Sequence, residues 1–192
     1  AGQINQTDRI SEFLRRAHTF LRSDRGAPVL LEVPSDVAME EISGIDSNYR
    51  PVKTYKSAGN PADVKEVAKL LLSAKRPVIY AGQGVLWAES TSQLIALAEL
   101  INAPVATTNS GKSAFPENHP LALGAAGNTV TKMARHFVDE ADLVFGIGSS
   151  FTTNLASMNI PSGKTLVQTT IDAKDLNKEH DLDHAIIGDC QL

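Results

Sequence analysis

The residues that could do chemistry in this 192-residue chain are small or hydroxylated, and most of them follow short apolar runs. The apolar run Val78–Ala81 leads directly into Gly82-Gln83-Gly84-Val85. A strand that ends in glycines lets a ligand approach the backbone closely, and the free N–H groups of a following helix suit a phosphate. The third glycine of a dinucleotide fingerprint is missing, so an ordinary strand-to-helix turn explains this stretch better.

Other apolar runs also end in small, hydroxylated or acidic residues. These positions matter because ligands of open α/β sheets bind beyond the carboxyl ends of the strands. Together these ends give the candidate cofactor-binding residues Gly82, Gln83, Gly84, Val85, Thr107, Thr108, Gly148, Ser149, Ser150, Asp172 and Asp189. Such side chains suit hydrogen bonds to phosphates and ribose hydroxyls, but they lack the paired nucleophile and base of covalent catalysis. Asp172 fits a ribose ligand and fits a cap of the following turn equally well.

Two further patterns give weaker indications of a site. Residues 106–113 resemble a loosened P-loop, but Pro116 and Pro120 exclude the helix that would have to follow it. His180 and His184 have a four-residue spacing, but acidic residues lie between them in a weak helical pattern, which favours a solvated turn. The sequence therefore predicts no catalytic residue and no metal ligand.

The composition limits the class of protein. A net charge of −4 without a basic stripe argues against a nucleic-acid binder, and no apolar run approaches the roughly 18 residues of a membrane span. Cys190 is the only cysteine, which excludes a disulfide framework and fits a reducing, cytoplasmic setting. The first residues lack the charged and apolar regions of a signal peptide. We expect the chain to be a piece of a longer protein.

Strands alternate with helices from residue 60 onward, which predicts a parallel sheet with helices on both faces. Asn60 followed by Pro61 predicts the start of a helix. Strands are expected at 78–81, 104–108, 143–148, 165–171 and 185–187, and helices at 90–101 and after Asn128, the expected N-cap. Residues 109–127 are expected to be irregular. Met133 and Phe137 are expected in the core, and Trp87 is expected to pack on the helix after the glycine turn.

The first part of the chain has a different character. One helical pattern from Thr7 and one strand pattern at 29–34 cannot build a core by themselves. Residues 1–36 are therefore predicted to be the C-terminal tail of a preceding domain. Periodicity then fades at Gly44, Asn48 and Pro51, which predicts a linker over 37–59 and a second domain over 60–192.

Several motifs, in order, resemble thiamine-diphosphate-dependent enzymes. Residues 26–37, Gly-Ala-Pro-Val-Leu-Leu-Glu-Val-Pro-Ser-Asp-Val, resemble the end of their N-terminal pyrimidine-binding domain. The later motifs resemble the central domain of these enzymes, closest to the acetolactate synthase branch. They are residues 76–85, 103–105, 111–121, 123–124, 141–144, 171–172 and 188–189. The resemblance implies a Rossmann-like three-layer α/β domain with a mostly parallel, about six-stranded sheet and helices on both faces.

The resemblance also implies a function for the parent protein. Such an enzyme decarboxylates a 2-oxo acid and joins the resulting carbanion to a carbonyl acceptor, as a homodimer or homotetramer. Thiamine diphosphate and Mg²⁺ bind between the flanking domains of two subunits. The activating glutamate and the Gly-Asp-Gly…Asn metal motif of those domains do not occur in this chain. The chain is therefore expected to be non-catalytic by itself.

In several family members the central domain binds FAD or an adenine nucleotide, which adds Gly124 and Ala125 to the candidate cofactor-binding residues. Two motifs depart from the FAD-binding pattern. Ser150 stands where an arginine is typical, with Thr152 and Thr153 at the acidic positions, and Gly124-Ala125-Ala126-Gly127 replaces a Gly-Met-His-Gly-like turn. Loss of a charge-assisted contact costs about 1.5–3 kcal/mol. FAD, ADP and a purely structural domain all remain open.

Two rival functions belong to other classes. One is a stand-alone nucleotide- or flavin-binding domain of the electron-transfer type, which shares the Rossmann-like fold. The other is a pyridine-nucleotide enzyme such as a deacetylase or dehydrogenase. That enzyme needs a catalytic histidine facing the glycine turn, and the sequence offers no candidate.

Overall fold

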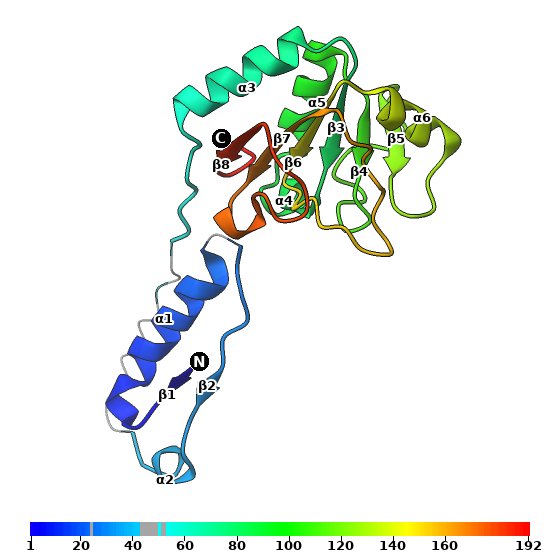
Figure 1. Cartoon of the computed structure of the whole chain (residues 1–192). Helices are drawn as coiled ribbons and strands as arrows, with labels where there is room; N and C mark the ends of the chain where they lie inside the picture. The colour runs from blue at the N-terminus through cyan, green and yellow to red at the C-terminus, as the bar shows by residue number, and fades with distance from the viewer. Residues whose placement is uncertain (24, 43–49, 51–52) are drawn as a thin grey trace. The chain divides into compact units, whose positions relative to one another are not determined.

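A computed structural model describes residues 1–23, 25–42, 50 and 53–192 (Figure 1). These residues form two compact units, Ala1–Lys56 and Ser57–Leu192, which are described separately. Gly44, Asn48 and Pro51, on which the predicted linker over 37–59 depends, lie outside the described residues. That linker stays a prediction.

The second unit is built on one sheet of six strands, all parallel (Figure 1). The strands are β3 (Pro77–Ala81), β4 (Val105–Thr107), β5 (Ala122–Ala125), β6 (Leu143–Ile147), β7 (Thr165–Thr170) and β8 (His184–Ile187). Their spatial order is β5-β4-β3-β6-β7-β8, so the chain builds outward from β3 in one direction and then returns to build from β6 in the other. This is the Rossmann strand order, with its switch point between β3 and β6.

Helices cover both faces of the sheet, as predicted. They are α3 (Pro61–Ser73), α4 (Gln83–Trp87), α5 (Thr91–Ile101) and α6 (Lys132–Glu140), with a short 3₁₀ turn, η2 (Ala173–Asp175). One core cluster joins Ile79 of β3 to α3 and α5, and a second joins its neighbour Val78 to α6. Because successive strand residues point to opposite faces, these clusters lie on the two sides of the sheet. The predicted three-layer fold is confirmed.

The predicted N-cap residue is confirmed for α3 and wrong for α6. The Asn60 side chain accepts a hydrogen bond from the Ala62 N–H at 3.0 Å, which confirms Asn60 as the N-cap of α3. The prediction for Asn128 is wrong, because α6 begins at Lys132 and its cap is Thr131. The Thr131 Oγ1 accepts from the Ala134 N–H at 3.1 Å.

Three further predictions about single elements are corrected. Residues 109–127 are not wholly irregular, since they contain β5, an edge strand paired with β4. Met133 and Phe137 are 51% and 41% exposed, because the small Ala134 and Val138 make the buried face of α6. Trp87 lies on the helix after the glycine turn, at the end of the short α4, but it is 57% exposed and so packs less than expected.

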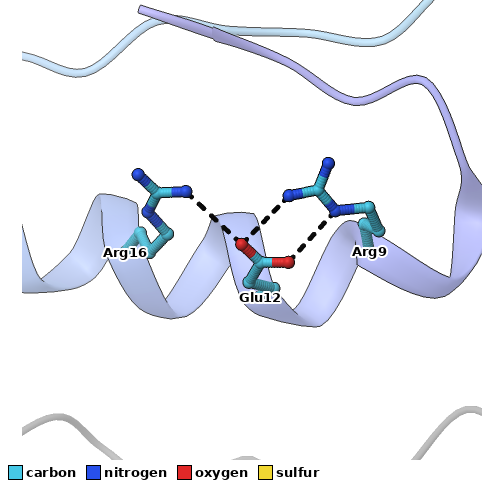
Figure 2. Close-up of polar contacts among 3 residues, drawn as sticks. All are labelled: Arg9, Glu12 and Arg16. Atoms are coloured by element: carbon cyan, nitrogen blue, oxygen red, sulfur yellow. Dashed lines mark hydrogen bonds and ion pairs between the residues drawn. The ribbon is translucent and has the colours of Figure 1, made fainter.

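The first unit holds a two-stranded parallel sheet and one long helix. Its elements are β1 (Gly2–Gln3), η1 (Thr7–Arg9), α1 (Ile10–Arg22), β2 (Leu31–Glu32) and α2 (Ser35–Ala38). On α1, the Glu12 carboxylate lies between two arginines and accepts from Arg9 and Arg16 (Figure 2). The hydrogen bond from Arg9 lowers the pKa of Glu12. Among the described residues of both units, no helix has the length and apolar character needed to cross a bilayer.

Candidate functional site

The candidate cofactor-binding residues lie along the carboxyl edge of the sheet, where the strand order predicted them. Gly124 and Ala125 lie within β5 at one end of the sheet, and Asp189 follows β8 at the other. Strands spaced by about 4.8 Å put the two ends of a six-stranded sheet roughly 24 Å apart. One small ligand therefore cannot contact the whole set. The residues that meet are those at the switch point.

At the switch point, the glycine turn after β3 and the loop after β6 are in direct backbone contact. A Cβ atom added to Gly82 would lie 2.2 Å from the Gly148 carbonyl oxygen, and one added to Gly84 would lie 2.7 Å from the Gly148 Cα. A Cβ on Gly148, whose φ is +58°, would lie 2.6 Å from the Val85 nitrogen. Glycine is needed at these positions because two backbones touch there. We call residues 82–85, 111 and 148–149 the switch-point clasp.

The N–H groups of Gly82, Gly84, Val85 and Gly148 in the clasp are bonded within the protein. The Gly82 N–H donates to the Ile147 carbonyl and the Gly84 N–H to the Gly148 carbonyl, both at 2.9 Å. The Gly148 N–H donates to the Thr169 carbonyl at 2.9 Å, and the Val85 N–H to the Gly82 carbonyl at 3.2 Å. A pyrophosphate at this turn would need these donors. These four N–H groups are therefore not free to bind a phosphate.

Three of the hydroxyl groups of the set, those of Thr108, Ser149 and Ser150, have local partners as well. Thr107 is buried, and the Thr108 Oγ1 accepts from the Gly111 N–H at 2.9 Å. The Ser149 Oγ accepts from the Phe151 N–H at 3.3 Å, and the Ser150 Oγ lies 2.8 Å from the Thr152 Oγ1. Gln83, between the two glycines, is exposed. These hydroxyls hold their own loops in place.

The two acids at the strand ends also form local contacts. The Asp172 Oδ1 accepts from the Lys174 N–H at 3.0 Å and caps η2, the structural alternative that the sequence left open. The Asp189 Oδ1 accepts from the Gln191 N–H at 2.8 Å. A ribose contact by Asp172 stays a prediction.

Two buried residues that sequence reasoning missed bridge different strand ends. Gln168 of β7 is 1% exposed, and its Nε2 donates to the Ser149 carbonyl at 2.9 Å and to the Asp175 carbonyl at 3.2 Å. The Tyr80 hydroxyl of β3 donates to the Ala126 carbonyl beyond β5 at 2.9 Å, and burial raises its pKa to about 12. The sequence held one signal for such a residue, which is Gln168 next to Leu166 and Val167 in the predicted strand at 165–171.

The described residues contain no group of three His, Cys, Asp or Glu side chains that could hold a metal ion. The two histidines with four-residue spacing have separate neighbours. The His180 Nε2 lies 3.5 Å from the Thr153 Oγ1. The His184 Nε2 of β8 lies 3.8 Å from the Oδ1 of Asp63, a residue of α3. The two histidines therefore do not meet in one place, although their spacing in the sequence is four residues.

Comparison with known proteins gives consistent results. Residues 64–192 match the family described as thiamine pyrophosphate enzyme, central domain. The chain is 35% identical over 198 residues to a probable acetolactate synthase large subunit of Methanococcus aeolicus, and the match covers 99% of this chain and 33% of that protein. It is 29% identical over 194 residues to a glyoxylate carboligase of Escherichia coli O157:H7, covering 100% of this chain and 33% of that protein.

Among solved structures, benzoylformate decarboxylase from Polynucleobacter necessarius superposes with a TM-score of 0.80 at 27% identity. The match covers 99% of this chain and 36% of that one. The chain thus spans about a third of the length of the relatives it matches. The family match covers more than half of the chain, and the six-stranded domain carries it. The chain belongs to the thiamine pyrophosphate enzyme family, and its residues 64–192 are the central domain.

Proposed function

We propose that this chain is the non-catalytic central domain of a longer thiamine-diphosphate-dependent enzyme that decarboxylates a 2-oxo acid and joins the product to a carbonyl acceptor. The family match over residues 64–192 carries this proposal. The named relatives support the reaction class, since they include an acetolactate synthase subunit and a glyoxylate carboligase. The parent works in the cytoplasm as a homodimer or homotetramer.

The role of Ser57–Leu192 in this proposal is to hold the flanking parts of the parent in place. Its polar strand ends are bonded to one another, and its core clusters fill both faces of the sheet. Thiamine diphosphate and Mg²⁺ bind outside this chain, on the flanking domains, where the cofactor stabilises the carbanion left by decarboxylation. The residues described here supply rigidity and spacing.

We also propose that residues 1–36 are the tail of a preceding domain, which completes them, and that residues 37–59 link this tail to the central domain. Two short parallel strands, one long helix and one short helix leave much apolar surface uncovered. Parallel sheets are stable when both faces are buried. The exposed apolar side chains of this unit include Leu14, Phe20, Leu21, Leu30 and Val33. More chain is needed to cover them.

The test is an assay of carbon dioxide release by the full-length parent with a panel of 2-oxo acids. We expect release that requires both thiamine diphosphate and Mg²⁺, and a coupled product when a carbonyl acceptor is present. The 192-residue chain alone is the control and should release none. A full-length parent that turns over no 2-oxo acid with both cofactors present would contradict the proposal.

A further inference from the structure

We infer that the switch point of this domain is closed by the protein itself and takes no adenine nucleotide, neither FAD nor ADP. The inference concerns a site within this chain and does not depend on the reaction of the parent. It rests on three features that occupy the place where a Rossmann-like sheet receives a cofactor.

The first feature is the switch-point clasp. The backbones of its two loops approach so closely that a Cβ atom at Gly82, Gly84 or Gly148 would overlap the opposite loop. Gly111 adds a third loop, since its Cβ would lie 2.7 Å from the Ala81 oxygen and the Gly82 carbonyl carbon. The glycines that suggested a phosphate site are thus needed for loop-to-loop contact, and their N–H groups already have acceptors.

The second feature is the ring of Phe151, which packs over β3 and β6 two residues before the clasp begins on each strand. Phe151 is 5% exposed and has a φ of +48°, a conformation that costs free energy in a non-glycine residue. Its ring stacks on Tyr80, with centroids 6.2 Å apart, and covers Gly146 of β6. A Cβ atom on Gly146 would lie 2.3 Å from the Phe151 Cζ. The ring therefore covers β3 and β6 at the switch point.

The third feature is a set of polar contacts that holds this loop to the segment after β7. The Lys178 Nζ donates to the Thr152 Oγ1 at 3.2 Å, and the same hydroxyl lies 2.8 Å from the Ser150 Oγ. The His180 ring lies edge-on to the Phe151 ring, with centroids 6.1 Å apart. The Lys178 ammonium group and the Ser150 and Thr152 hydroxyls are thus engaged with one another. An adenine nucleotide would have to break these contacts before binding.

Hydrogen exchange on the 192-residue chain tests this directly. We expect the amides of Gly82, Gly84 and Gly148 to exchange as slowly as those of the central strands β3 and β6, at rates unchanged by FAD or ADP. Amides that exchange fast in the free protein and become protected when either nucleotide is added would overturn the inference. So would saturable one-to-one binding of FAD or ADP tighter than about 1 mM, the weak end of specific recognition.

A pair of neighbouring substitutions separates packing from binding. Gly84→Ala places a methyl group against Gly148 and should lower the Tm, whereas Gln83→Ala changes an exposed side chain in the same turn and should leave the Tm unchanged. A Gly84→Ala protein as stable as wild type would contradict the clasp. If Gly84→Ala does not fold, the exchange rates and the nucleotide titration of the wild-type chain still decide the matter.

Discussion

Tyr80 is the residue whose buried polar group gives the clearest test of the core. Its hydroxyl reaches from β3 past β4 to the Ala126 carbonyl, and burial raises its pKa to about 12. Tyr80→Phe removes the donor and leaves a carbonyl unpaired, so we expect a loss of about 1–3 kcal/mol in the free energy of unfolding. Urea unfolding near neutral pH measures this, and a Tyr80→Phe protein at least as stable as wild type would show that the hydrogen bond contributes nothing.

The raised pKa of Tyr80 also predicts a pH dependence. The folded state keeps the phenol proton to about pH 12, whereas the unfolded chain releases it near the ordinary value of 10. The contribution of the protonated Tyr80 to the free energy of unfolding is therefore fully present below pH 10. It is lost as the pH rises toward 12, by at most about 1.4 kcal/mol per pH unit. Tyr80→Phe lacks this component, so its unfolding free energy should fall less steeply over the same range. Parallel slopes for the two proteins would contradict the prediction.

Asp142 gives a second prediction, with the opposite sign. Burial alone would raise the pKa of its carboxyl group, but backbone N–H groups, those of Lys75 and Arg76 among them, outweigh burial and hold the pKa below its ordinary value of 3.8. The two donors lie 2.7 and 2.9 Å from the carboxylate oxygens. The contribution is thus present above pH 3.8 and is lost as the pH falls through the lowered pKa.

Asp142→Asn keeps the shape of the side chain and replaces one acceptor oxygen with an NH₂ group. We expect a loss of about 0.5–1.5 kcal/mol near neutral pH, because solvent screens this carboxylate, and a smaller difference from wild type in strong acid. Urea unfolding at both pH values measures it. A difference that grows as the pH falls would mean that the carboxylate is not the stabilising form.

Among the helices and strands, the N-cap of α6 is the point at which the sequence-based prediction and the structure differ in a testable way. Both Asn128 and Thr131 are good N-cap residues by type, and the structure uses Thr131. Thr131→Ala should cost about 1 kcal/mol, whereas Asn128→Ala should leave the stability of the helix unchanged. Thermal unfolding of the two variants measures this. A larger loss for Asn128→Ala than for Thr131→Ala would restore the original prediction.

The elements that the sequence predicted well are those with strong local patterns. Asn60-Pro61 marked the start of α3, and the apolar runs after Arg76 and Asp142 marked β3 and β6. Strand β5 was not predicted because it is four residues long, lies at the sheet edge, and carries Gly124 at a φ of +79°. Its pairing with β4 is a long-range contact that no local pattern reveals.

The candidate site shows the same division between local and long-range information. The strand ends could be placed along one edge because parallel strands share their direction. What the glycines do there could not be predicted, because it depends on Gly148 lying against Gly82 and Gly84, residues more than 60 positions apart. A glycine turn that receives a phosphate and one that receives another loop have the same sequence pattern.

For the whole molecule, the two units should differ in their ability to fold alone. A chain shortened to residues 57–192 keeps the six-stranded sheet and both core clusters, so we expect cooperative unfolding with a Tm close to that of the full chain. Residues 1–56 alone keep two short strands and exposed apolar side chains, and should show no cooperative transition. Circular dichroism during heating compares them. A cooperative transition for residues 1–56 would contradict the proposal that another domain completes this unit.

The central claim is that this chain is a structural domain of a larger enzyme and holds no cofactor of its own. The most direct test is the Tm of the 192-residue chain alone and with thiamine diphosphate plus Mg²⁺, FAD or ADP in excess. A ligand at a hundred times its Kd adds about 2.7 kcal/mol to the stability of the folded state, which would raise the Tm by several degrees. We predict the same Tm in every case. A saturable rise with any one of the three would contradict the account and show which cofactor the domain binds.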